Sequence, residues 1–127
     1  MLKTESKFSP SAIELIWSEL NKEAKLWSIS EPALEKLFQK TILDQKSFKA
    51  GMTEVIASEL SADDKDYIPI HEAASEAFNN DPFLEEAAAA DLCATLERDP
   101  ACHSYLKPFL FYKGYQAIQA YRLANWL

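Results

Sequence analysis

Apolar side chains recur at helical spacing through most of this chain, and this pattern constrains its fold more than any other feature. The first run has them three or four positions apart, at Ile13, Ile16, Trp17, Leu20, Ala24 and Trp27. That spacing places them on one face of a helix, whereas a half-buried strand would alternate polar and apolar residues. No strand alternation, internal repeat or low-complexity tract interrupts the pattern. The sequence therefore predicts an all-α fold.

The composition supports the same prediction. The only glycines are Gly51 and Gly114, while alanine is frequent, and this balance favours helices over turn-rich sheets. A length of 127 residues, with 48% hydrophobic and 26% charged residues, suits one globular domain with an ordinary core. We expect a compact domain of about six to eight helices over residues 9–127, after an N-terminal tail of residues 1–8.

Helix-start signals divide the domain. Ser9-Pro10-Ser11 opens the first helix, with Ser11 and Glu14 at capping-box spacing. We expect later helices to begin at Ser30-Glu31-Pro32, after Ser47, at Pro69, at Asp81-Pro82 and at Arg98-Asp99-Pro100. The fifth runs from Phe83 to about Glu97, and its alanines at 87–90 allow a neighbouring helix to approach closely. Pro108 interrupts or restarts the pattern before a last long aromatic helix that presents Phe111, Tyr115, Ile118 and Arg122 along one side.

The charge balance excludes several classes of partner. Thirteen basic and twenty acidic side chains give a net charge of −7, which repels phosphate backbones and anionic lipid surfaces. No apolar run approaches the ~20 residues that span a bilayer, and the first seven residues lack the apolar core of a signal peptide. We expect a cytoplasmic protein that binds neither nucleic acid nor membrane.

The cysteines and histidines do not form a recognisable site. Cys93 and Cys102 lie on either side of a predicted helix junction; a bridge between them stays open, although buried thiols are more typical of a cytosolic protein. Cys102 and His103 are adjacent and cannot face one point on a helix, and with His71 they lack the spacing of a closed zinc site. We expect no metal site and surface or partly buried histidines. Neither a Gly-rich phosphate loop nor a nucleophile elbow is present.

Asp99 is the strongest candidate for a binding residue. A carboxylate at a helix start lies beside unpaired backbone N–H groups, which keep it ionised and oriented while an oxygen can still accept from a substrate ammonium. The simpler interpretation is a helix cap with no further role, because capping is the common role of Asp at such a position. The nearby aromatic residues could line a ligand pocket, but they fit helix packing or a subunit interface more simply: Tyr105, Phe109, Phe111, Tyr112, Tyr115 and Tyr121.

The end of the sequence indicates a larger protein. Helices usually close with Gly or Asn past the last turn, or with Pro shortly beyond it. Here the last pattern finishes on Trp126 and Leu127, which at a frayed terminus would expose apolar surface. We therefore expect this chain to be a piece of something longer.

One segment is specific enough to indicate a family. Glu97-Arg98-Asp99-Pro100-Ala101, followed by Tyr105, Pro108 to Tyr115 and Ala117 to Arg122, resembles the N-terminal helical domain of bacterial serine acetyltransferase. The resemblance extends from about Ile13 to Leu127, because further matching residues occur upstream in a similar order: Ile16-Trp17, Glu31-Pro32, Leu60, Ala77 and Asp81-Pro82.

The resemblance implies a role within a larger enzyme. In that family the helical domain precedes a left-handed parallel β-helix of hexapeptide repeats, which forms trimers, and the helical domains join two trimers into a hexamer. The enzyme transfers acetyl from acetyl-CoA to the hydroxyl of L-serine, toward cysteine, and L-cysteine inhibits it at the serine site. Self-association of this chain would then use apolar residues between Ile13 and Phe38, and no β-helix belongs to this chain.

The resemblance also assigns a role to Asp99. The Asp of the Arg-Asp-Pro element helps to bind the amino group of serine or inhibitory cysteine, whereas the histidine base and the residues that grip the carboxylate belong to the β-helix. This chain would therefore hold no catalytic residue, bind no cofactor and be inactive alone, since acyl transfer also needs a base, oxyanion stabilisation and a thioester site. The alternative is a free-standing helical interaction module, which a reading frame without hexapeptide repeats would indicate.

Overall fold

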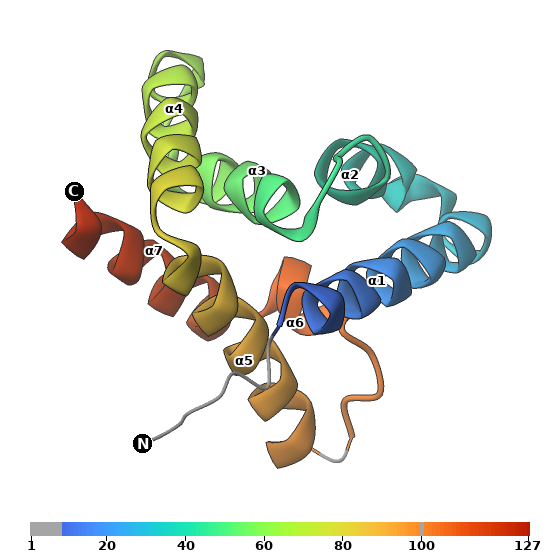
Figure 1. Ribbon diagram of the computed structural model, residues 1–127. Coiled ribbons are helices and arrows are strands. Elements are labelled where there is room, and N and C mark those ends of the chain that lie inside the picture. The colour runs from blue at the N-terminus through green and yellow to red at the C-terminus, as the bar shows by residue number, and fades with distance from the viewer. Residues whose placement is uncertain (1–8, 100) are drawn as a thin grey trace, which may run out of the picture.

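The computed structural model describes residues 9–99 and 101–127, and within that part of the chain it contains helices and no strand (Figure 1). The elements in chain order are α1 (Pro10–Ser30), η1 (Pro32–Leu34), α2 (Glu35–Phe38), η2 (Gln39–Leu43), α3 (Phe48–Leu60), α4 (Asp64–Asn80), α5 (Pro82–Arg98), α6 (Leu106–Phe111) and α7 (Lys113–Trp126). The all-α prediction is confirmed. The predicted tail of residues 1–8, and Pro100, lie outside the described residues.

An aromatic cluster joins α1, α3 and α6 at the centre of the core. The Phe48 and Phe109 rings are 5.6 Å apart, and Trp17 of α1 lies 6.5 Å from the first and 6.3 Å from the second. Phe48 and Phe109 are almost completely buried. Such contacts between aromatic rings add to the burial of apolar area, so this cluster fixes how three helices distant in sequence meet.

Gly51 allows α3 to approach α1 and η2 closely. A Cβ atom at this position would lie 2.7 Å from the Trp17 ring and 2.8 Å from the carbonyl oxygen of Thr41. Both distances are shorter than van der Waals contact, so a side chain cannot be accommodated without movement. The close approach explains why a residue with poor helix propensity lies in the middle of a helix.

The predicted starts of α3 and α5 are confirmed, and α1 begins as expected with a different cap. Ser47 accepts the N–H of Ala50 at 3.2 Å, and Asp81 accepts the N–H of Phe83 at 3.1 Å. At α1 the cap is Ser9, whose hydroxyl accepts the N–H of Ala12 at 3.3 Å, and not Ser11. The expected short second helix consists of three successive turns of 3₁₀, α and π geometry (η1, α2 and η2), which bury Phe38 and Ile42.

The prediction that a helix begins at Pro69 is wrong. Helix α4 begins at Asp64, because the Asp63 carboxylate caps it by accepting the N–H of Lys65 at 2.9 Å. Acidic Asp64 and Asp66 then favour the first turn through the helix dipole. Pro69 is the sixth residue of the helix, where it lacks the internal N–H hydrogen bond and its ring crowds the carbonyl one turn earlier, yet α4 continues through it.

The predicted last long helix is divided in two, so that expectation is also wrong. Tyr112 has an extended backbone, with φ −89° and ψ 105°, and separates α6 from α7. The Gln116 side chain hydrogen-bonds a backbone carbonyl in the last turn of α6: its Nε2 donates to the carbonyl oxygen of Leu110 at 2.8 Å. Gln116 therefore stabilises the break, because carbonyls at a helix end otherwise lack partners.

The break also changes which side of the C-terminal helix is buried. The expected face included Phe111 and Ile118, but both are exposed, and the buried residues of α7 are Tyr115, Gln116, Gln119 and Leu123. Alanines of α5 accommodate this face as expected: the Tyr115 hydroxyl donates to the carbonyl oxygen of Ala88 at 2.7 Å. Trp126 and Leu127 are exposed.

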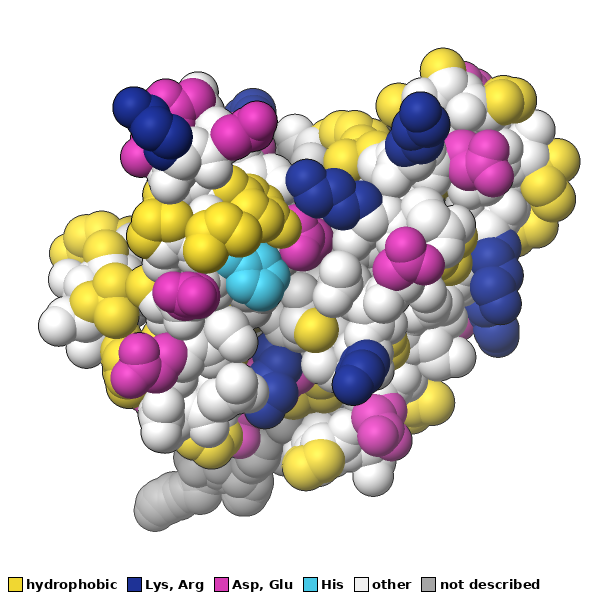
Figure 2. Space-filling model, turned by 90° about the horizontal axis from the view of Figure 1, so that it is seen from above, with side chains coloured by type: hydrophobic (Ala, Val, Ile, Leu, Met, Phe, Trp, Pro, Cys, Tyr) yellow, Lys and Arg dark blue, Asp and Glu magenta, His cyan; other side chains and the backbone are white. Residues whose placement is uncertain are grey.

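Polar contacts and surface charge complete the architecture. Arg122 of α7 donates to Asp91 of α5 at 2.7 Å, and Gln119 donates to the same carboxylate oxygen at 2.9 Å. Figure 2 shows a face over α2, α3 and α4 on which acidic, basic and hydrophobic side chains are interspersed. Among the helices that the structure describes, none is long and apolar enough to cross a membrane.

Candidate functional site

Asp99 does not begin a helix, so the predicted helix-start role is wrong. It ends α5, where its N–H still donates to the carbonyl oxygen of Thr95 at 3.1 Å, and residues 101–105 after it are not helical. The next helix begins at Leu106. Asp99 is half-buried at the turn between α5 and α6.

Pro108 disfavours a helix that would begin directly after Asp99. A helix that began at residue 100 would place Pro108 in its interior, where the ring clashes with the carbonyl one turn earlier and a hydrogen bond is lost. With the start at Leu106, Pro108 is the third helical residue, whose N–H would have no partner within the helix anyway. The same dipeptide works at Asp81-Pro82, because no second proline follows there within α5.

Hydrogen bonds within the turn orient the Asp99 side chain. Its Oδ1 accepts the N–H of Ala101 at 3.1 Å, and its backbone carbonyl accepts the N–H of Cys102 at 2.9 Å. Its Oδ2 lies 3.4 Å from the Tyr112 hydroxyl, which donates to it. An ionised carboxylate has about four acceptor positions, so these bonds leave lone pairs open for a further donor.

Glu23 of α1 secures the other end of this turn. Its carboxylate accepts the N–H of Leu106 at 2.9 Å and the N–H of Tyr105 at 3.4 Å. These are the first backbone donors of α6, which has no cap from its own N-cap residue. Burial raises the pKa of Glu23, although these two backbone hydrogen bonds lower it in part. No local pattern in the sequence indicates this role of Glu23, because the helix that it caps lies more than eighty residues away.

Tyr112 contacts Asp99 from the junction of α6 and α7. Its phenol also lies beside the thiol of Cys102, which is buried and donates to the carbonyl oxygen of Ser104 at 3.3 Å. The hydrogen bond with Cys102, together with burial and the charge of Asp99, raises the pKa of Tyr112 to about 12. The phenol is neutral at physiological pH, as an ordinary tyrosine is, and acts as a donor to Asp99.

The aromatic residues serve mainly in packing. Phe109 and Tyr115 are buried, Tyr105 and Tyr112 are half-buried, and Phe111 and Tyr121 are exposed. The expected packing role is thus confirmed for Phe109 and Tyr115. Tyr112 is the member of this set that contacts Asp99.

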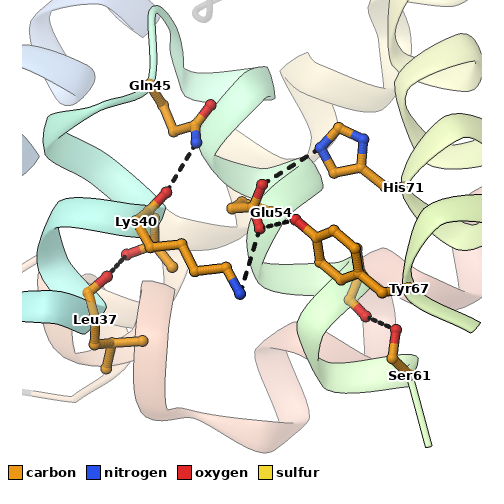
Figure 3. A network of polar contacts seen from close by, with 9 residues as sticks. Leu37, Lys40, Gln45, Glu54, Ser61, Tyr67 and His71 are labelled. Atoms are coloured by element: carbon orange, nitrogen blue, oxygen red, sulfur yellow. Dashed lines mark hydrogen bonds and ion pairs between the residues drawn. The ribbon is translucent and has the colours of Figure 1, made fainter. Parts of the chain in front are cut away.

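The two histidines lie in different surroundings. His103 is exposed, whereas His71 is half-buried with Nε2 3.4 Å from a carboxylate oxygen of Glu54. The Glu54 carboxylate of α3 also accepts a hydrogen bond from the Tyr67 hydroxyl and lies 3.8 Å from the Lys40 ammonium. Figure 3 shows these side chains grouped around Glu54. Glu54 is only 6% exposed, so these partners compensate a buried charge that the sequence analysis did not single out.

This polar cluster around Glu54 stabilises the packing of η2, α3 and α4. Burial, and then the hydrogen bond to Glu54 and its charge, raise the pKa of Tyr67. Within residues 9–99 and 101–127, no group of three or more His, Cys, Asp or Glu side chains could hold a metal ion. Cys93 and Cys102 are both thiols, half-buried and buried respectively, and no disulfide joins them.

A groove on the described part of the chain lies away from Asp99. It has a volume of about 520 Å³ between the first turns of α1, α3 and α5, and its apolar walls include Ile13, Trp17 and Phe48. The half-buried carboxylate of Glu85 accepts the N–H of Lys49 at 3.2 Å, and burial raises the pKa of Glu85. The only site residue of the sequence analysis, Asp99, does not line this groove.

The Asp99 turn offers binding chemistry rather than catalysis. A fixed carboxylate with open lone pairs suits a positively charged donor such as an ammonium. Asp99, Tyr112 and Cys102 supply one carboxylate, one phenol and one buried thiol, whereas acyl transfer to a hydroxyl also requires a positioned base and donors for the oxyanion. The geometry alone therefore supports a contribution to a binding site.

Comparisons with known proteins match most of the chain. A sequence model of the family described as serine acetyltransferase, N-terminal, matches residues 16–120. The serine acetyltransferase of Escherichia coli (strain K12) is 34% identical over 115 residues, which cover 91% of this chain and 42% of that protein. The chain thus spans less than half the length of this relative.

Solved structures agree with the sequence matches. A serine acetyltransferase from Vibrio cholerae aligns with a TM-score of 0.87 at 40% identity, over 91% of this chain and 45% of its own. The soybean enzyme complexed with serine aligns with a TM-score of 0.85 at 36% identity, over 91% of this chain and 48% of its own. A serine acetyltransferase in complex with CoA aligns with a TM-score of 0.86 at 31% identity, over 91% of this chain and 49% of its own. Another, in complex with cysteine, aligns with a TM-score of 0.86 at 32% identity, over 90% of this chain and 47% of its own.

Proposed function

The chain belongs to the family of serine acetyltransferase N-terminal domains, and we propose that it assembles such an enzyme and supplies part of its substrate site. The enzyme would transfer acetyl from acetyl-CoA to the hydroxyl of L-serine, in the biosynthesis of cysteine. Support for these ligands comes from the solved relatives in complex with CoA, serine and cysteine. The chain itself would bind no cofactor, and acetyl-CoA would be a co-substrate of the whole enzyme.

Asp99 would bind the amino group of serine. The observation that carries this proposal is the half-buried Asp99 carboxylate, which has Oδ1 bonded to Ala101 and Oδ2 near Tyr112, within the residues that match the family. Serine and cysteine both carry an α-ammonium, so one carboxylate could orient the substrate and the inhibitor alike. The base and the acetyl-CoA site would come from the part of the enzyme that this chain does not include, and the chain alone would form no O-acetylserine.

Assembly would use the outer face of α1. Leu15, Leu26 and Ile29 are 72%, 66% and 78% exposed, although α1 buries four other apolar residues in the core. Positions 15, 26 and 29 lie on one side of a helix, since eleven and fourteen residues are close to three and four turns. This stripe is where a second copy of the domain would pack, as the joining of two trimers requires.

Substitution of Asp99 in the full-length enzyme tests the substrate role. Asp99→Asn removes the charge but preserves shape, so we expect the KM for serine to rise about tenfold to hundredfold, as for loss of a hydrogen bond to a charged group. The KM for acetyl-CoA should stay unchanged in steady-state assays of O-acetylserine formation. Asp66→Asn, at an exposed carboxylate in the first turn of α4, is the matched control. An unchanged KM for serine in Asp99→Asn would refute the role.

A further inference from the structure

Tyr112 is held at a defined place between two helices. Its N–H donates to the carbonyl oxygen of Pro108 in α6 at 3.4 Å, and its own carbonyl accepts the N–H of Gln116 in α7 at 3.1 Å. Its extended backbone forms both the end of one helix and the start of the other. The direction of the Tyr112 side chain is therefore determined by α6 and α7 together, independently of the turn that contains Asp99.

The phenol and the turn hold different oxygens of one carboxylate. Ala101 donates to Oδ1 at 3.1 Å from within the turn, while Tyr112 donates to Oδ2 at 3.4 Å from thirteen residues away. The second distance is at the long end of hydrogen bonding, and contacts of this kind commonly tighten when a ligand is bound. With both oxygens engaged, rotation of the carboxylate about its last bond is restricted, and its open lone pairs face a fixed direction.

A neutral donor suits this position if Asp99 binds a cation. Lys or Arg here would neutralise the carboxylate and compete with an ammonium, whereas a phenol orients the oxygen and leaves its negative charge available. A tyrosine phenol is protonated at physiological pH at its ordinary pKa of about 10, and the hydrogen bond with Cys102, burial and the charge of Asp99 raise the pKa of Tyr112 further, to about 12. The Tyr112 phenol is thus a neutral donor to Asp99 across the physiological pH range.

We propose that Tyr112 is a positioning residue for the Asp99 carboxylate, which it orients toward the α-ammonium of an amino-acid substrate. The proposal rests on the proposed function, because it assumes that Asp99 meets this ammonium. It goes further than the proposed function, because the α6–α7 junction would then help the enzyme to select substrates that carry an amino group. The effect of Tyr112 on the ligand is exerted entirely through Asp99.

The test compares the steady-state kinetic constants of the full-length enzyme for two substrates, serine and 3-hydroxypropionate. The second substrate lacks the amino group. Tyr112→Phe should raise the KM for serine about threefold to tenfold, as for a weakened charge-assisted hydrogen bond, and should change neither kcat nor the KM for acetyl-CoA. The preference for serine over 3-hydroxypropionate should narrow by the same factor. Tyr121→Phe, at an exposed tyrosine of α7, is the control and should have no effect.

A double-mutant cycle separates positioning from a general structural effect. In the Asp99→Asn background, Tyr112→Phe should add nothing to the KM, because its only route to the substrate has been removed. An equal rise in both backgrounds would overturn the proposal, as would an unchanged KM in Tyr112→Phe while Asp99→Asn raises it. An Asp99→Asn variant with an unchanged KM would instead overturn the proposed function itself, and this inference with it.

Discussion

At the scale of single residues, several positions owe their identity to one close contact. Gly51 has no room for a Cβ atom between Trp17 and Thr41, and Gln116 supplies the donors that the end of α6 lacks. Asp99 and Tyr112 meet only because the chain reverses between them. None of these side chains belongs to a repeating pattern, so each depends on a neighbour that is distant or across a break.

The two glycines give a matched pair of substitutions. Gly51→Ala gains up to about 1 kcal/mol of helix propensity, but its Cβ would clash with the Trp17 ring and a backbone carbonyl. We expect a net loss of about 1 to 3 kcal/mol in the free energy of unfolding, as for an overpacked core. Gly114→Ala meets no atom within 4 Å and should be neutral or stabilising. Urea unfolding of the two variants checks this, and equal stabilities would contradict it.

At the scale of elements, helix ends decide where the chain bends. Asp63 and Asp81 cap α4 and α5 with their own side chains, which is a local arrangement that the sequence pattern can indicate. Helix α6 has a local cap as well, since the Ser104 hydroxyl accepts the N–H of Lys107 at 3.1 Å, but its first two donors are satisfied by Glu23, a residue of α1. The turn that contains Asp99 is therefore stabilised at its far end by packing between the first helix and the sixth.

Removing the Glu23 carboxylate should loosen α6 and the turn before it. Glu23→Ala leaves two backbone donors without a partner, so we expect a loss of about 1 to 3 kcal/mol in the free energy of unfolding at pH 7. Amide exchange at Tyr105 and Leu106 should accelerate. Glu19→Ala, one turn earlier on α1 and largely exposed, is the control. Unchanged exchange at Leu106 would show that Glu23 does not cap α6.

The pH dependence of Glu23→Gln follows from the raised pKa. Burial lifts the folded-state pKa above the ordinary value of 4.5, so the folded protein binds this proton more tightly than the unfolded chain does. The wild type should therefore lose stability relative to Glu23→Gln as pH rises from 4.5 through the folded pKa. Urea unfolding of both proteins across this range measures the difference, and a difference independent of pH would contradict the assignment.

At the scale of the whole molecule, the exposed stripe on α1 lies opposite the residues that α1 buries. Ile13, Ile16, Leu20 and Ala24 face the core, while Leu15, Leu26 and Ile29 face outward. Self-association was expected through apolar residues between Ile13 and Phe38, and the large apolar side chains of that range that the structure leaves exposed are Leu15, Leu26 and Ile29. Scattered exposed apolar residues are common, but three on one side of one helix favour an interface.

Sedimentation can test whether this stripe associates. We expect the chain to form a dimer or a larger assembly at high concentration, and Leu26→Glu to shift it to the monomer, because a buried charge at an interface is costly. Leu60→Glu, at an exposed leucine on α3, should leave the association unchanged. A wild-type chain that stays strictly monomeric would remove the basis for the proposed assembly surface.

The sequence by itself determined the all-α class, the starts of α3 and α5 and most of the core, because these depend on neighbours three or four residues apart. Only the tertiary structure decided the division at Tyr112, the burial of Gln116 and Gln119, the cap from Glu23 and the surroundings of Asp99. The Asp-Pro signal at residue 99 follows the local rules for a helix start, but no helix begins there. Pro108 and the distant Glu23 carboxylate make a start at Leu106 more favourable. Local patterns record short-range hydrogen bonding and periodicity, whereas the candidate site is built from contacts that exist only once the helices have packed.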